Sequence, residues 1–126
     1  EPLSRAYGMP KVTEAERAAK EQVMEVALRD ASLVPLQIME TAGQMLDLLE
    51  ELAQIGSRLA ISDVGVGVQF CRSAVLGASM NIFINTKMMK DRKLAEQLNE
   101  KAEQLIAEKS VQADRIFEEV KAVLKG

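Results

Sequence analysis

Residues 62–85 read SDVGVGVQFCRSAVLGASMNIFIN, and this segment is the most informative one about the fold class. From Val64 to about Asn85 it is mostly apolar all round a helical projection, which is typical of a central, buried helix. Valine and glycine first alternate as in a strand, but a row of small or polar residues then recurs every four positions: Ser73, Gly77, Asn81 and Asn85. We therefore expect a helix that begins at Ser62 and Asp63, where a hydroxyl caps the first turn and a carboxylate suits the helix dipole.

Small residues interrupt this apolar segment at Gly67, Ala74, Gly77 and Ala78. A glycine costs about 1 kcal/mol in a helix interior, so it is usually kept where bulk does not fit. We expect another helix to approach closely at these positions. The alternative is that the small residues make room for a ligand.

The segments before residue 62 predict two helices. Residues 1–12 contain two prolines and a glycine and are expected to form an extended lead-in. A helix should start at Thr13, because Thr13 and Glu16 have the spacing of a capping box. Pro35 predicts a break or kink, after which a second helix runs to Ile55. Gly56 is placed to end it. Its acidic face is expected to be solvated and not a metal site: Glu40, Asp47, Glu50 and Glu51.

Residues 91–124 are charged and carry a helical apolar stripe, so they predict one long amphipathic helix of roughly 50 Å. A helix of this length should either bend near Ser110 or pack partly on a second subunit. The sequence thus predicts an all-α fold: one domain over residues 1–126, a bundle of about four helices with a buried central helix and a long carboxyl-terminal helix.

Composition excludes several classes of function. The chain has 126 residues, 16 basic and 19 acidic side chains, a net charge of -3, no histidine and one cysteine. Catalytic relays and zinc sites that depend on imidazole are therefore excluded. The lone Cys71 fits a reducing compartment, and the cytoplasm is expected. Mild acidity and 3% aromatic residues speak against nucleic acid, and no uncharged run is long enough to cross a membrane. A chain of this size gains from a partner, so a homodimer or higher homo-oligomer is expected.

Three polar residues within the apolar segment are candidates for chemistry. Without histidine, Asp63 is the most plausible general acid or base, because burial raises the pKa of a carboxyl toward neutrality. Its alternative role is to cap the helix. Asn81 and Asn85 lie four positions apart and project from one face. Their amides need partners, which are either the backbone of a neighbouring helix or a ligand.

A basic cluster in this mildly acidic chain is a candidate site for an anion. It consists of Lys87, Lys90, Arg92 and Lys93. Cations near a helix start are not placed for the dipole of that helix, so an anionic ligand or a solvated loop explains them. Arg58 and Arg72 are further candidates, and Cys71 is expected to act as a small, inert hydrophobic residue.

These residues carry a resemblance to a known family. The residues concerned are the runs Val34-Pro35-Leu36, Ser62-Asp63-Val64-Gly65-Val66, Ala74-Val75 and Ile84-Asn85, together with Pro10-Lys11, Thr13-Glu14, Gly56, Gly77 and Asn81. In this combination they resemble the cyclodeaminase family. That family comprises the cyclodeaminase part of formiminotransferase-cyclodeaminase and the methenyltetrahydrofolate cyclohydrolases. The similarity extends from about Met9 to Leu124. Two departures stand out: no upstream glycine-rich Gly-Gly-Gly-Ser segment is present, and Ser57-Arg58-Leu59 replaces an asparagine found before Ser-Asp in many relatives.

The resemblance implies an all-helical dimer that acts on a one-carbon derivative of tetrahydrofolate without a metal or redox cofactor. Asp63 would transfer a proton or stabilise the cationic one-carbon centre, and Ser62 would orient it. Asn81 and Asn85 would bind the pterin or the one-carbon unit, and Lys87 would attract the glutamate tail. These residues would then line one shared pocket.

The chain is expected to lack an upstream part of the family domain. The alternative is therefore a non-catalytic helical dimerisation module or an inactive fragment.

Overall fold

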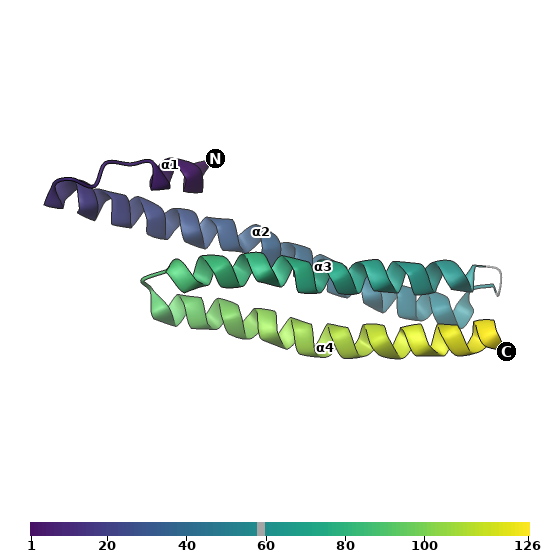
Figure 1. Cartoon of the computed structure of the whole chain (residues 1–126). Helices are drawn as coiled ribbons and strands as arrows, with labels where there is room; N and C mark the ends of the chain where they lie inside the picture. The colour runs from purple at the N-terminus through teal and green to yellow at the C-terminus, as the bar shows by residue number, and fades with distance from the viewer. Residues whose placement is uncertain (58–59) are drawn as a thin grey trace.

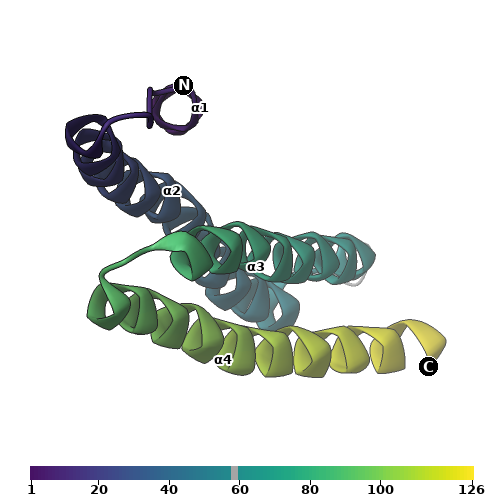
Figure 2. The same ribbon diagram turned by 60° about the vertical axis from the view of Figure 1, so that its left-hand side comes forward.

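The computed structural model describes residues 1–57 and 60–126, and these residues form four helices. They are α1 (Pro2–Tyr7), α2 (Glu14–Ile55), α3 (Ile61–Met88) and α4 (Arg92–Lys125). The predicted all-α fold of about four helices is confirmed. Helix α3 packs against both α2 and α4, while α1 packs against the first part of α2, which extends beyond the other helices (Figures 1 and 2). None of these helices is long and apolar enough to cross a membrane.

The amino-terminal lead-in is partly helical, so the expected extended conformation over residues 1–12 was wrong. Pro2 starts α1, where a missing N–H is no loss because the first amides of a helix have no partner anyway. Gly8 then ends this helix. At the start of α2 the prediction is confirmed, since the Thr13 hydroxyl accepts a hydrogen bond from the Glu16 amide at 3.1 Å.

Helix α2 continues through Pro35 as a single helix of 42 residues, so of the predicted break or kink the break was wrong, and one helix stands where two were expected. Proline has no N–H, and an ordinary residue at position 35 would have donated to the carbonyl of Ala31. The side-chain amide of Asn85 on α3 donates to that carbonyl at 3.2 Å. The structure therefore replaces the missing backbone hydrogen bond with one from a neighbouring helix, which is the alternative considered above for Asn85.

The two later helices differ from the predictions mainly at their ends. Helix α3 begins two residues early, with Ala60 at the N-cap, so Ser62 lies inside the first turn and is not the cap. Helix α4 is one helix of 34 residues that spans about 51 Å. Its N-cap is Asp91, whose carboxylate accepts a hydrogen bond from the Leu94 amide at 3.0 Å.

The core lies between α2, α3 and α4. Its largest fully buried hydrophobic side chains are Leu28, Met39, Leu46, Ile82 and Ile116. Burying each of them contributes about 1.5–3 kcal/mol. A Cβ built on Gly65 would lie 3.1 Å from Cγ1 of Val120 on α4, which is a tight contact at a glycine that was not predicted to need one. A Cβ on Gly67 would lie 3.4 Å from the Leu49 side chain, which is an ordinary contact. A Cβ on Gly77 would meet no described atom within 4 Å.

A polar network joins α2 to α4 on the outside of the bundle. Gln112 donates to Asp47 at 2.8 Å and to Glu50 at 3.0 Å. Lys109 pairs with Asp47 at 3.1 Å and Arg115 with Glu50 at 2.6 Å. These partners lower the pKa of both carboxyls, mainly through the hydrogen bond from Gln112 to Asp47 and that from Arg115 to Glu50. Two of the four predicted solvated acids are thus bound to α4.

Candidate functional site

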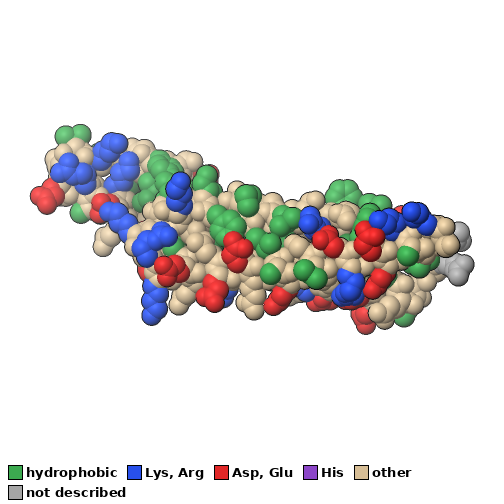
Figure 3. Space-filling view, turned by 60° about the horizontal axis from the view of Figure 1, so that its bottom comes forward, with side chains coloured by type: hydrophobic (Ala, Val, Ile, Leu, Met, Phe, Trp, Pro, Cys, Tyr) green, Lys and Arg blue, Asp and Glu red, His purple; other side chains and the backbone are tan. Residues whose placement is uncertain are grey.

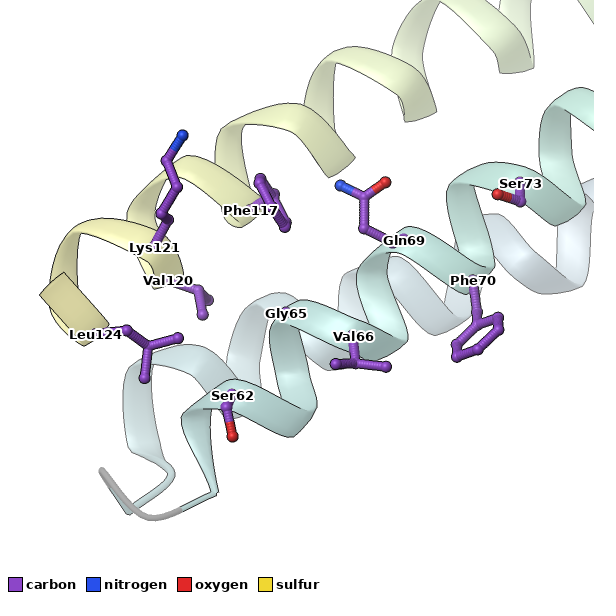
Figure 4. A pocket seen from close by; sticks show the side chains of 10 residues that line it. All are labelled: Ser62, Gly65, Val66, Gln69, Phe70, Ser73, Phe117, Val120, Lys121 and Leu124. Atoms are coloured by element: carbon purple, nitrogen blue, oxygen red, sulfur yellow. The ribbon is translucent and has the colours of Figure 1, made fainter.

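An open groove of about 470 Å³ runs between the first turns of α3 and the last turns of α4. Its walls are largely apolar and are formed by Gly65, Val66, Phe70, Phe117, Val120 and Leu124. Four polar side chains border it: Ser62, Gln69, Ser73 and Lys121 (Figure 4). Ligand sites of this size usually combine apolar walls with a few polar groups. The groove is therefore a candidate binding site, and it includes the predicted residue Ser62.

Ser62 and Asp63 point in different directions. Ser62 lines the groove. Because successive residues of a helix are rotated by about 100°, Asp63 projects to a neighbouring side of α3. Both side chains are exposed. Burial would favour a proton-transfer role for Asp63, but the described residues of the single chain do not bury this side chain.

Asn81 and Asn85 lie far from Asp63 in the same chain. Asp63 and Asn81 are 18 positions apart in α3, which is five helical turns or about 27 Å. Asn81 is exposed, whereas Asn85 is half-buried and bound to α2 through Ala31. The expectation that the carboxylate and both amides line one pocket is therefore not met within one chain.

Several cations of the predicted basic cluster serve the fold. Arg92 donates from one guanidinium nitrogen to the carbonyls of Thr86 at 2.8 Å and Met89 at 2.9 Å, which caps the carboxyl end of α3. Lys90 pairs with Glu21. Lys87 is exposed in the last turn of α3, where a cation suits the helix dipole. The cations therefore stand at the end of α3 as well as at the start of α4.

Two further predicted cations and the cysteine differ in their surroundings. Arg72 pairs with Asp114 on α4 at 2.9 Å. Arg58 lies outside the described residues. Cys71 is buried, and desolvation raises the pKa of its thiol, as expected for a small hydrophobic residue of the core.

Sequence reasoning missed the groove residues Gln69, Phe117 and Lys121. Gln69 projects from α3 toward α4 (Figure 4). A signal existed for two of them, because Phe117 and Lys121 are four positions apart and therefore adjacent on α4. The ammonium of Lys121 lies 5.7 Å from the centroid of the Phe117 ring. Which face of α3 they meet depends on packing that the sequence alone does not reveal.

A bundle of long helices with an apolar, polar-rimmed groove defines a class of all-α protein with a candidate small-molecule site. The sequence model of one protein family, described as formiminotransferase-cyclodeaminase, matches residues 1–104. The chain belongs to this family.

Individual relatives support the same assignment. The chain is 37% identical to the methenyltetrahydrofolate cyclohydrolase of Methylorubrum extorquens, over 93% of this chain and 56% of that protein. It is 33% identical to the formimidoyltransferase-cyclodeaminase of Rattus norvegicus and 32% identical to that of Mus musculus, over 93% of this chain and 22% of each relative. The chain thus spans about half the length of the first relative and about a fifth of the other two.

Proposed function

We propose that this chain acts on a one-carbon derivative of tetrahydrofolate, as a methenyltetrahydrofolate cyclohydrolase or a formiminotetrahydrofolate cyclodeaminase. The observation that carries this proposal is the 37% identity over 93% of the chain to a relative named methenyltetrahydrofolate cyclohydrolase. The groove between α3 and α4 supports it, because its apolar walls and polar rim suit a flat, partly polar ligand.

Both reactions need proton transfer and orientation of the substrate. In the cyclodeaminase reaction, the second folate nitrogen attacks the formimino carbon, a proton is lost and ammonia leaves. In the cyclohydrolase reaction, water adds to the methenyl carbon and the ring opens. Asp63 is the proposed proton-transfer group, and the Ser62 hydroxyl on the groove is proposed to orient it or the substrate. The proposal includes no metal or redox cofactor.

A homodimer in the cytoplasm is the proposed assembly and setting. Large apolar side chains on α3 are exposed in the single chain, and the exposed fractions of Phe70 and Ile84 are 74% and 62%. Apolar surface of this kind usually marks an interaction site. The unpaired Cys71 suits a reducing compartment.

The proposal is tested by adding each substrate to the purified chain and following the methenyl absorbance. Loss of absorbance from the methenyl derivative indicates a cyclohydrolase. A gain of absorbance from the formimino derivative, with release of ammonia, indicates a cyclodeaminase. A correctly folded dimer that turns over neither substrate would contradict the proposal.

The role of Asp63 is tested with a matched pair of variants. Loss of a general acid or base typically lowers the rate by about 10² to 10⁴. We expect Asp63→Asn to lose activity on that scale and Asp30→Asn, which changes an exposed carboxylate on α2, to retain it. Unchanged turnover in Asp63→Asn would remove this residue from the mechanism.

A non-catalytic dimerisation module is the second candidate. The separation of Asp63 from Asn81 in one chain favours it, because the predicted polar groups do not meet there. A stable dimer that binds neither folate derivative would support this candidate.

A further inference from the structure

A second pocket lies at the opposite end of α3 from the groove, and we call it the amino-terminal pocket. Its volume is about 260 Å³, and three separate parts of the chain line it. They are the lead-in before α2, the first turns of α2, and the end of α3 with the turn to α4. Met88 of this pocket and Ser62 of the groove are 26 positions apart in α3, or about 39 Å. The two sites are therefore separate within one chain.

Four cations border the amino-terminal pocket: Lys11, Arg17, Lys20 and Lys90. Two carboxylates, Glu21 and Glu25, also border it, so the local excess is two positive charges in a chain whose net charge is -3. In Figure 3, Lys and Arg side chains gather over the end of the molecule where α1 and the first turns of α2 lie, whereas both charges mix along the rest of that face. Charge of one sign around a hollow attracts ions of the opposite sign.

Both carboxylates of the pocket already have partners. Glu21 pairs with the Lys90 ammonium. Glu25 accepts hydrogen bonds from the backbone amides of Lys90 and Asp91, the latter at 3.2 Å. These contacts tie α2 to the turn between α3 and α4. The two acidic residues in the first turn of α2 do not line the pocket. The other three cations of the pocket therefore have no carboxylate partner among the described residues.

These three cations keep their charge available to a ligand. Lys11 and Arg17 are exposed, and their side chains make no ion pair with a described residue. Lys20 is half-buried, and its ammonium donates to the Tyr7 carbonyl at 2.8 Å, which carries no net charge to neutralise it. Arg17 and Lys20 are three positions apart on α2, which places their Cβ atoms about 5–6 Å apart on one face. Two anionic groups a few bonds apart can meet both.

Two methionines give the pocket an apolar part. Met24 is half-buried and packs against the core, and the Met88 sulfur accepts a hydrogen bond from the Tyr7 hydroxyl at 2.9 Å. Flexible thioether side chains adapt to irregular apolar groups. Sites for drug-sized molecules have volumes of about 300–1,000 Å³, so this slightly smaller pocket suits a smaller ligand. A bare phosphate would leave the methionines in contact with water, whereas a short hydrocarbon chain covers them.

We propose that the amino-terminal pocket binds a small dicarboxylate, a molecule whose two carboxylates are joined by a short hydrocarbon chain. The Arg17 guanidinium binds one carboxylate through two parallel hydrogen bonds, a geometry that lysine does not offer. Lys11 and Lys20 bind the second carboxylate, and the methionines contact the chain between the two. The dicarboxylate is either a free molecule or the end of a larger one. This site is additional to the proposed folate site and does not depend on it.

A ligand in this pocket holds together three parts of the chain. Lys11 belongs to the lead-in, and Tyr7 just before it contacts Lys20 and Met88. The first part of α2 extends beyond the other helices, so its opening releases the ligand (Figure 1). Binding to the closed form alone lowers the open population by a factor of one plus the ratio of ligand concentration to Kd, which is about tenfold at ten times Kd. Binding is therefore visible as slower amide exchange at this end.

Nuclear magnetic resonance of the parent chain tests the site without any assay of activity. Glutarate is the probe, and sodium chloride keeps the ionic strength constant. We expect saturable shifts at the amides of residues 11–25 and 88–91. Amide exchange in the first turns of α2 should slow about tenfold at ten times Kd, and the last turns of α4 should not change. Shifts that do not saturate, or that are equally large along α4, would overturn the proposal.

A matched pair of arginine variants tests the assigned contacts. Hydrogen bonds to charged groups contribute about 1.5–3 kcal/mol, so Arg17→Gln should raise the Kd for glutarate at least about tenfold. The Arg17 side chain has no described ion-pair partner, so the helical content should match that of the parent. Arg29→Gln is the control, because Arg29 lies on the same helix outside the pocket and pairs with Asp30 at 3.5 Å. An unchanged Kd in Arg17→Gln, or equal losses in both variants, would contradict the proposal.

Three further probes decide the chemical class of the ligand. Inorganic phosphate has the charge without the hydrocarbon chain, and butyrate has the chain with only one carboxylate, so both should bind more weakly than glutarate. If either binds as tightly, the dicarboxylate assignment is overturned. Alanylglutamate carries the same dicarboxylate at the end of a larger molecule. Tighter binding of alanylglutamate supports the proposal with the larger ligand, and tighter binding of glutarate supports it with the free one.

Discussion

Replacing Asn85 tests how α2 continues through Pro35. The amide of Asn85 donates to the Ala31 carbonyl at 3.2 Å, and Pro35 is the reason that this carbonyl lacks its backbone partner. A hydrogen bond of this kind contributes about 1 kcal/mol net, and both residues are half-buried, so solvent replaces it only in part. We expect Asn85→Ala to lower the free energy of unfolding by about 1 kcal/mol.

The decisive measurement is a double-mutant cycle with Pro35→Ala. In the Pro35→Ala background, residue 35 has an N–H that donates to Ala31, so the loss of the Asn85 amide should have little further effect. The coupling between the two positions should therefore be about 1 kcal/mol, above the 0.3–0.5 kcal/mol within which independent sites add.

Urea unfolding followed by far-ultraviolet circular dichroism measures all four proteins. Asn81→Ala is the matched control, because Asn81 is exposed one turn away on the same helix and should change stability by less than about 0.5 kcal/mol. Additive effects of Asn85→Ala and Pro35→Ala would refute the idea that one compensates for the other. An effect of Asn81→Ala as large as that of Asn85→Ala would also contradict it.

Three further predictions concern stability. Ile82→Ala removes a fully buried side chain and should cost about 2–5 kcal/mol in urea unfolding, whereas equal stability would contradict the assigned core. Thr13→Ala removes the N-cap of α2 and should cost about 1 kcal/mol, with faster amide exchange confined to the first turn of that helix. The pKa values of Asp47 and Glu50 are lowered from 3.8 and 4.5, so their contribution is present above these values and is lost as the pH falls below them. The unfolding midpoint should decline below about pH 4 less steeply in an Asp47→Asn, Glu50→Gln variant than in the parent, and identical profiles would refute the role of the network.

Local signals in the sequence predicted much of the fold. The cap at Thr13 and the long apolar stripe after residue 91 depend on neighbours within one or two turns, and the structure confirms both. The break at Pro35 was wrong because the compensating donor, Asn85, lies 54 positions away and depends on helix packing. The start of α3 was misplaced because the cap is Ala60, which has no side-chain group to reveal it.

The candidate site was less predictable than the fold. Sequence reasoning singled out Ser62, which lines the groove, but it could not give the direction of Asp63 one residue later. The segment after residue 62 is apolar all round, and this pattern is the same whether its outer face meets its own chain or a second one. The sequence shows the spacing of Asp63 and Asn81, but only the length of an unbroken α3 shows that one chain keeps them apart.

The first part of α2, which extends beyond the other helices, has a consequence for local unfolding. Each of the three long helices contacts mainly the helix that precedes or follows it in the chain, which is the connectivity of a simple helical bundle. Domains of this kind fold quickly, because little loop entropy is lost before contacts form. The first part of α2 lies beyond the other helices (Figure 1). It is therefore the part whose fraying leaves the rest intact, and it should be the first target of a protease.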